Sequence, residues 1–180
     1  PGEAGLWERF SPLRLAYLLR VRALLRDYGP SASPFNAFLL LLGIETLSLR
    51  MRQHVANARE VVAFLSEHPL VAAVHYAELP DSAWRAAAAT YLPNGAGSVF
   101  SFELHGGIEA GKRFIAALKL FSHIANIGDV RSLAIQPAST THSPLTESER
   151  ASVGIPAGLI RLSIGIEDAR DLLADLSAAL

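Results

Sequence analysis

Segments with helical and strand-like hydrophobic patterns alternate along this chain, and this alternation is the strongest constraint on its fold. Helices are predicted for residues 11–27, 33–42, 46–68, 83–91, 108–120 and 168–180. Short strands are predicted for residues 71–76, 97–104, 132–135 and 159–164. The order predicts an α/β or α+β fold, in which parallel crossover connections are available.

The second helical segment has a clear start and an unusually apolar body. Ser33 is a good helix cap, and Pro34 suits the first turn. Residues 35–42 are apolar on almost every face, so we expect them to be buried on most sides. The next helix ends at His68-Pro69, and a domain boundary is expected near residues 66–69 because this long helix can bridge two parts.

Composition excludes several classes of protein. Hydrophobic residues make up 51% and charged residues 18%, which is typical of a globular chain with a large core. The net charge of -1 offers no basic excess for nucleic acid. The longest apolar run, residues 37–42, is far shorter than the roughly 20 residues of a membrane span, so no membrane partner is expected. Cysteine is absent, which is compatible with a cytoplasmic location.

The sequence carries no metal or nucleotide motif. The histidines are scattered without the close spacing of a zinc site, so we interpret them as surface or helix-end residues and expect no metal. They are His54, His68, His75, His105, His123 and His142. Glycine-rich phosphate-binding motifs and a nucleophile elbow are also absent.

Arg161 is the residue most suggestive of a binding site. It lies between Ile160 and Leu162 in a strand-like run and would therefore point to the opposite face. If both faces of the sheet are covered, its charge needs an anion, and a substrate carboxylate matches a guanidinium bidentately. An internal salt bridge or simple exposure remain alternatives. Polar residues 126–129 and 136–142 are dense in hydrogen-bonding groups.

Several long segments resemble one enzyme family. Residues 33–51 and 52–58 are similar to the long-helix signature of the Cys/Met-metabolism enzymes that depend on pyridoxal phosphate (PLP). Residues 119–129 resemble the substrate-site loop of that family. Residues 137–142 and 160–168 complete the set in the family's order, so the resemblance covers nearly the whole chain.

The resemblance implies a fold and a domain division. It implies the C-terminal small domain of a fold type I PLP-dependent transferase, with a small mixed or antiparallel sheet flanked by helices and preceded by a long linking helix. Residues 1–66 would be the end of the large PLP-binding domain and the inter-domain helix, and residues 67–180 the small domain. Members are usually homotetramers, and a cytoplasmic location is expected for this chain.

Within the family, Asn126-Ile127-Gly128 and Thr140-Thr141-His142 are similar to the O-acetylhomoserine sulfhydrylases. These enzymes make homocysteine or methionine from O-acetylhomoserine and sulfide or a thiol. The resemblance implies that Arg161 binds the α-carboxylate of this amino-acid substrate and that Asn126 lies against the carboxylate. It also implies that Thr141 helps hold Arg161 and the loop of Asn126 in place. Gln136 stands where many members have histidine, so it receives no role. Cystathionine γ-synthase and methionine or cystathionine γ-lyase are the alternatives.

One departure from the family pattern concerns the cofactor. The family's PLP-binding lysine and phosphate-binding glycines precede all the matched segments, and the only lysines here, Lys112 and Lys119, lack its context. Without that lysine the chain has no covalent anchor for PLP. We therefore expect this chain to be the C-terminal part of a longer enzyme. The chain itself is expected to contain no catalytic or cofactor-binding residue and to be inactive alone. A non-catalytic carboxylate-binding or oligomerisation module is the other alternative.

Overall fold

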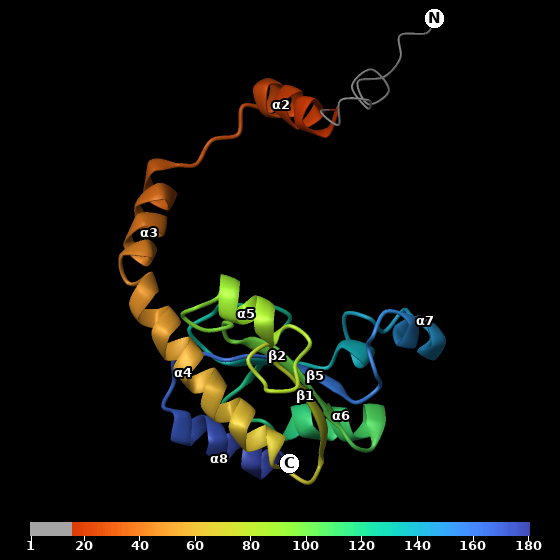
Figure 1. Cartoon of the computed structure of the whole chain (residues 1–180). Helices are drawn as coiled ribbons and strands as arrows, with labels where there is room; N and C mark the ends of the chain where they lie inside the picture. Colours follow the sequence, from red (N-terminus) through yellow and green to blue (C-terminus); the bar gives the residue numbers. More distant parts are fainter. Residues whose placement is uncertain (1–15) are drawn as a thin grey trace, which may run out of the picture. The chain divides into compact units, whose positions relative to one another are not determined.

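The computed structural model describes residues 16–180, and contacts divide the chain into residues 1–45 and residues 46–180. The first unit contains helices α2 (Ala16–Tyr28) and α3 (Pro34–Glu45) (Figure 1). The helix predicted for residues 11–27 is confirmed where it is described, and its first part lies outside the described residues. The backbone N–H of Asn36 donates to Ser33 Oγ over 3.1 Å, so the predicted cap of α3 is confirmed.

The prediction that residues 35–42 are buried on most faces is wrong for the described residues. No residue of α3 is buried, and Phe35 is 67% exposed. The composition of this helix nevertheless suits an interior. The hydrophobic pattern correctly indicates a helix that favours burial, but it carries no information about which neighbours are present.

The second unit contains five strands, four longer helices and two short ones. The strands are β1 (Val71–His75), β2 (Val99–Leu104), β3 (Ser122–His123), β4 (Leu133–Ile135) and β5 (Leu159–Ser163). The helices are α4 (Leu47–Ser66), α5 (Arg85–Tyr91), α6 (Gly107–Ala117), the 3-10 helix η2 (Pro137–Ser139), α7 (Glu147–Ser152) and α8 (Ala169–Ala179). Apart from the two-residue β3, each strand and each of the helices α4, α5, α6 and α8 was predicted to within a few residues.

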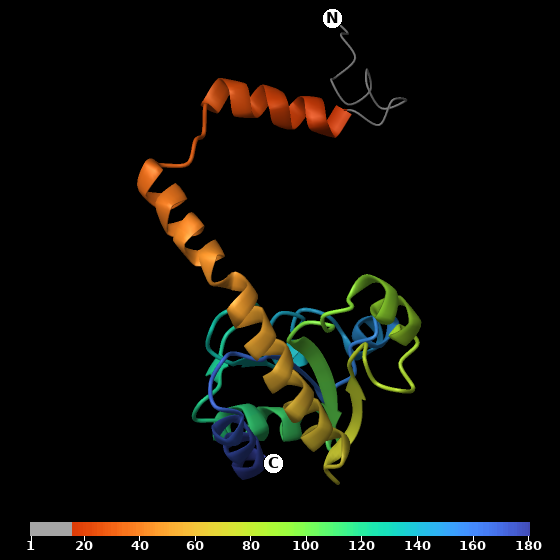
Figure 2. The ribbon, with the colours of Figure 1, turned by 60° about the vertical axis from the view of Figure 1, so that its left-hand side comes forward.

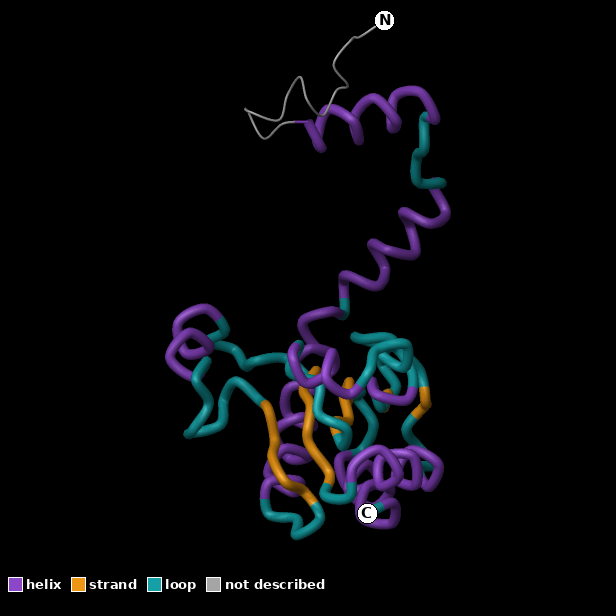
Figure 3. Tube along the Cα trace, turned by 90° about the vertical axis from the view of Figure 1, so that its right-hand side faces the viewer, coloured by secondary structure: helices purple, strands orange, loops and turns teal. Residues whose placement is uncertain are grey.

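The strands form one mixed sheet in the order β1-β2-β5-β4-β3. Only β3 and β4 pair in parallel, whereas the other neighbours are antiparallel. Figure 3 shows the strands side by side with helices around them. The expected small mixed sheet flanked by helices is confirmed, and β5 lies at its centre.

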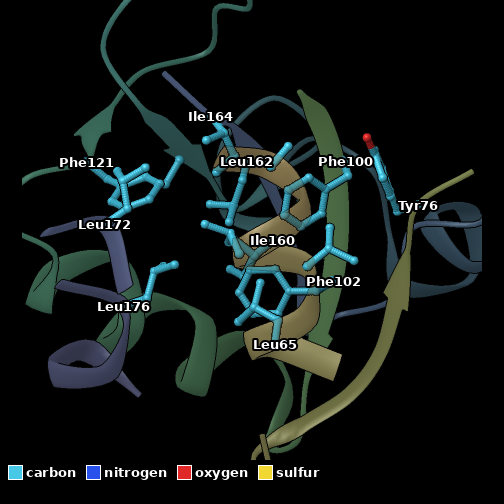
Figure 4. Close-up of a cluster of buried hydrophobic side chains, with 14 of the residues drawn as sticks. Leu65, Tyr76, Phe100, Phe102, Phe121, Ile160, Leu162, Ile164, Leu172 and Leu176 are labelled. Carbon is cyan, nitrogen blue, oxygen red and sulfur yellow. The ribbon is translucent and has the colours of Figure 1, made fainter. Parts of the chain in front are cut away.

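One face of this sheet carries the hydrophobic core. Phe102 of β2 and Ile160 of β5 are register partners, and both are fully buried. Phe102 meets Phe114 of α6 with ring centroids 5.6 Å apart in an edge-to-face arrangement. Helix α4 contributes Leu65 and α8 contributes Leu176, both with no exposed surface. Figures 1 and 2 show α4, α6 and α8 on this face of the sheet. In Figure 4 the side chains of Leu65 and Leu176 lie on the same side as those of the sheet's core residues.

Within the described residues, no single helix is both long and apolar enough to cross a membrane, although α3 and α4 pass that test as an interrupted pair.

Helix α4 offers a matched pair of leucines for testing the core. Leu65→Ala removes a fully buried side chain and leaves a cavity, so the free energy of unfolding should fall by about 2–5 kcal/mol. Leu49→Ala, at a site 58% exposed on the same helix, should change it by about 0.5 kcal/mol or less. Urea denaturation followed by circular dichroism measures both. Equal losses in the two variants would contradict this assignment of the core face.

Tyr76 lies just after β1 with its hydroxyl in a shielded position. The side chain is only 5% exposed, and the hydroxyl donates to the carbonyl of Gly97 over 2.9 Å. Burial first, and then the negative charge of Glu78, raise the pKa of Tyr76 to about 12. Glu78 is itself fixed by two hydrogen bonds from Arg59, of 2.7 and 3.0 Å.

This raised pKa gives stability a pH dependence in the alkaline range. Unfolded tyrosine loses its proton near pH 10, whereas folded Tyr76 keeps it to about pH 12. The free energy of unfolding should therefore fall between about pH 10 and pH 12, because the unfolded state loses protons first. Urea denaturation of wild type and Tyr76→Phe across this range measures the effect, which should be smaller in the variant. Parallel curves would exclude Tyr76 as the cause.

Candidate functional site

Arg161 lies on the face of the sheet opposite the core. Ile160 and Leu162 of β5 are fully buried in the core, so Arg161 and Ser163 point the other way. The register places Arg161 between Ser101 of β2 and Ile135 of β4. Because paired residues share a face, these side chains form one row across the centre of the sheet.

A loop between β3 and β4 meets this row. Arg161 Nη2 donates to the carbonyl of Asn126 over 3.3 Å, and the N–H of Gly128 donates to Ser163 Oγ over 3.1 Å. The backbone N–H of Arg131 donates to Asp129 over 3.0 Å and holds the pKa of that carboxyl below its usual value. The structure therefore brings together Arg161 and Asn126, two of the three residues predicted to bind substrate.

The far end of the same loop is fixed by Glu167. Its carboxylate accepts the N–H of Ser132 over 2.6 Å and the Ser132 hydroxyl over 2.9 Å, and that hydroxyl accepts the N–H of Gly165 over 2.8 Å. The N–H of Ile166 donates to the carbonyl of Val130 over 2.9 Å. These bonds hold the end of the loop against the segment that follows β5.

Glycine is required at position 165 by this close approach. A Cβ atom there would lie 2.4 Å from the carbonyl oxygen of Val130 and 2.3 Å from a Glu167 oxygen. Contacts this short cannot be accommodated without moving the backbone of the loop.

Helix α4 fixes the segment after β5 from the core side. His54 Nδ1 lies 2.6 Å from the carbonyl oxygen of Ile164. The amide of Asn57 donates to the carbonyls of Gly165 and Glu167 over 3.1 and 2.7 Å. The interpretation of His54 as a surface or helix-end histidine is wrong, because it is 3% exposed and hydrogen-bonded inside the fold. Spacing along the chain could not reveal a partner 110 residues away.

Arg161 forms no internal salt bridge with the described residues. Its side chain is half-buried rather than enclosed, and within the described residues no carboxylate oxygen lies within 4.0 Å of the guanidinium. The premise that both faces are covered at this point is therefore not met. A guanidinium has five N–H donors, so most of them stay available after the bond to Asn126.

Thr141 has a different immediate partner. Its hydroxyl lies 2.9 Å from His142 Nδ1, and no hydrogen bond in the described part of the chain joins it to Arg161 or Asn126. Nearby Gln136 is buried and donates to the carbonyl of Ile108 over 2.9 Å, which is a structural role. The role of Thr141 in substrate binding stays a prediction.

Two hollows of the second unit lie away from Arg161. One of about 350 Å³ follows the end of β1 and is lined by His75, Tyr76 and Trp84, among others. Another of about 450 Å³ lies between α4 and Asn94-Gly95. Among the described residues no group of three His, Asp or Glu side chains could hold a metal ion.

The lysines of this chain do not fit a covalent PLP site. Lys112 Nζ is exposed and bonds Glu109 over 2.8 Å on α6, which packs against the core face through Phe114. Lys119 is also exposed, and its backbone N–H donates to Asp175 of α8 over 2.9 Å. Arg161 points to the other face of the sheet. No reaction step through the cofactor can therefore be derived from these residues.

Comparisons with known proteins identify the class. The family model described as "Cys/Met metabolism PLP-dependent enzyme" matches residues 15–180, and the chain belongs to this family. The O-acetyl-L-homoserine sulfhydrylase of Leptospira meyeri is 47% identical over 178 residues, which are 98% of this chain and 40% of the relative. The L-methionine gamma-lyase of Pseudomonas putida is 46% identical over 162 residues, covering 90% of this chain and 40% of the relative.

A solved structure agrees with this assignment. The putative O-acetylhomoserine (thiol)-lyase of Campylobacter jejuni, which carries a pyridoxyl-lysine, superposes with a TM-score of 0.81 at 42% identity. The superposition covers 92% of this chain and 39% of that one. The resemblance inferred from the motifs is thus confirmed, and the chain spans about 40% of the length of the curated relatives it matches.

Asn57 provides a test of the connection between α4 and the segment after β5. Asn57→Ala leaves the carbonyls of Gly165 and Glu167 without their donor, which should lower the free energy of unfolding by about 1–3 kcal/mol. Asn94→Ala, at an exposed turn, should change it by about 0.5 kcal/mol or less. Urea denaturation distinguishes them, and a neutral Asn57→Ala would show that these bonds contribute nothing net.

Proposed function

We propose that this chain forms the C-terminal part of a PLP-dependent O-acetylhomoserine sulfhydrylase. Such an enzyme makes homocysteine or methionine from O-acetylhomoserine and sulfide or a thiol. The observation that carries the proposal is the match to the Leptospira meyeri sulfhydrylase, at 47% identity over 98% of this chain. The unpaired donors of Arg161 beside Asn126 support it, because they suit the carboxylate of an amino-acid substrate.

In this proposal each residue of the site acts through binding. Arg161 binds the α-carboxylate bidentately, and the carbonyl of Asn126 orients the guanidinium. Fixing the carboxylate fixes the orientation of the whole substrate relative to the reacting groups. PLP, when bound, supplies the electron sink for the reaction, and its attachment belongs to residues outside this chain. Thr141 would complete the pocket.

The proposal also covers the domain division of the chain, its oligomeric state and its cellular location. Residues 1–66 would end the large PLP-binding domain and include the linking helix, and residues 67–180 would form the small domain. A cytoplasmic homotetramer is proposed, in which the apolar surface of α3 is covered by protein.

A γ-lyase or cystathionine γ-synthase is the second candidate. The chain is 46% identical to the Pseudomonas putida methionine gamma-lyase, nearly as much as the 47% identity to the sulfhydrylase. This near-equality supports a γ-lyase as a candidate. The candidates differ in the second substrate. A sulfhydrylase uses sulfide, a γ-synthase uses cysteine, and a γ-lyase releases a thiol without needing either.

A hybrid enzyme tests the proposal. In it, this chain replaces the matched 40% of the Leptospira meyeri relative. We expect the folded, PLP-containing hybrid to convert O-acetylhomoserine and sulfide to homocysteine, measured by chromatography. Activity with cysteine instead, or thiol release from methionine, would favour the second candidate. A folded hybrid with none of these activities would contradict the proposal.

Arg161 is the residue on which binding should depend most. In the hybrid, Arg161→Ala should raise KM for O-acetylhomoserine and lower kcat/KM by about 10- to 100-fold, as expected for a lost charge-assisted pair. Arg161→Lys keeps the charge but loses the planar fork, so its effect should be intermediate. Arg113→Ala, on the exposed side of α6, is the control. An unchanged KM for Arg161→Ala would remove Arg161 from the site.

A further inference from the structure

Ser163 is a buried polar residue that the proposed mechanism does not yet use. Its side chain is 1% exposed and lies on the same face of β5 as Arg161, two residues further along the strand. The Ser163 hydroxyl oxygen accepts the N–H of Gly128, at the turn that also presents the Asn126 carbonyl to Arg161.

We propose that Ser163 is a positioning residue for Arg161, a role that rests on the proposed function. By accepting the Gly128 N–H it holds the turn of residues 126–128 along β5. The Asn126 carbonyl then stays against the guanidinium and selects the orientation in which the remaining donors face the substrate carboxylate. Ser163 contacts neither substrate nor cofactor in this role and acts only through the turn.

The spacing of the two connections supports this role. Arg161 and Ser163 are two positions apart on the strand, which is about 6.6 Å. Asn126 and Gly128 are also two positions apart on the turn. Asn126 bonds Arg161 and Gly128 bonds Ser163, so the two pairs follow the same order. The turn therefore lies along the strand and is fixed at two points. Removal of one point leaves only the 3.3 Å contact between Arg161 and Asn126.

The backbone at Gly128 explains why its N–H can reach Ser163. Its φ of +75° lies in the left-handed region, which glycine adopts without steric cost. A Cβ atom at this position would meet nothing within 4 Å, so the requirement is conformational and not a matter of space. The left-handed conformation of Gly128 thus directs its N–H toward Ser163 of β5.

The other anchors of the loop cannot replace Ser163. The bonds of Glu167 to Ser132 and of Ile166 to Val130 hold residues 130–132, at the end of the loop. No other hydrogen bond of the described residues fixes the N–H of Gly128. Loss of Ser163 should therefore loosen residues 126–128 while the end of the loop stays in place.

Amide hydrogen exchange of the 180-residue chain tests the connection without any activity measurement. Ser163→Ala should speed exchange of the Gly128 N–H by about fivefold or more, as expected when a hydrogen bond worth about 1 kcal/mol is lost. Ser163→Cys fills similar space with a weak acceptor and should act in the same direction. Ser66→Ala, which removes a hydroxyl bonded to the Val62 carbonyl, should not change Gly128 exchange. Unchanged exchange in both Ser163 variants would overturn the inference.

Steady-state kinetics of the hybrid enzyme test the action through Arg161. Ser163→Ala should raise KM for O-acetylhomoserine by about fivefold with kcat nearly unchanged, whereas Ser66→Ala should alter neither. In an Arg161→Ala background, Ser163→Ala should add no further increase, because the group it positions is gone. A full additional effect in that background, or none in wild type, would overturn the inference.

The two proposals fail in different ways. If Arg161→Ala alone leaves KM unchanged, the proposed substrate site is wrong, and the inference falls with it even if Gly128 exchange responds to Ser163. If Arg161→Ala raises KM but the Ser163 variants change neither exchange nor KM, only the positioning role of Ser163 is wrong.

Discussion

The alternation of side chains along β5 is the constraint on which the rest of the second unit depends. Ile160 and Leu162 are buried beneath α4, α6 and α8, and a strand that buries one set of side chains must direct the other set away. Arg161 and Ser163 belong to that second set. A shift of one residue in the pairing of β5 would bury the charge of Arg161 in the core. The pairing register that buries Ile160 and Leu162 therefore also places Arg161 at the candidate site.

Polar contacts then link this strand to its surroundings in a continuous set. His54 and Asn57 of α4 bond the carbonyls that follow β5, and Glu167 in that segment bonds Ser132 at the end of the loop. The loop in turn presents Asn126 to Arg161. Helix α4 therefore contributes to the core on one stripe and to the position of the candidate site through its polar residues.

The local elements could largely be predicted because their signals are local. The strand pattern in residues 97–104 predicted β2, in which Phe100, Phe102 and Leu104 are buried. The capping box of Thr146 and Glu149 at the start of α7 is likewise a local sequence pattern. The two-residue β3 could not be predicted, because its pairing with β4 and not its composition makes it a strand. The burial of α3 was wrongly predicted for the same reason, since burial needs a neighbour.

The sequence by itself determined the family, the order of the longer helices and strands, and the direction in which Arg161 points. Each follows from residue types at short spacing or from matched motifs. Only the tertiary structure decided that His54 is buried, that Asn126 meets the guanidinium and that Ser163 holds Gly128. These contacts join residues 35 to 110 positions apart, and hydrogen bonds over such separations depend on how the chain packs, not on its local pattern.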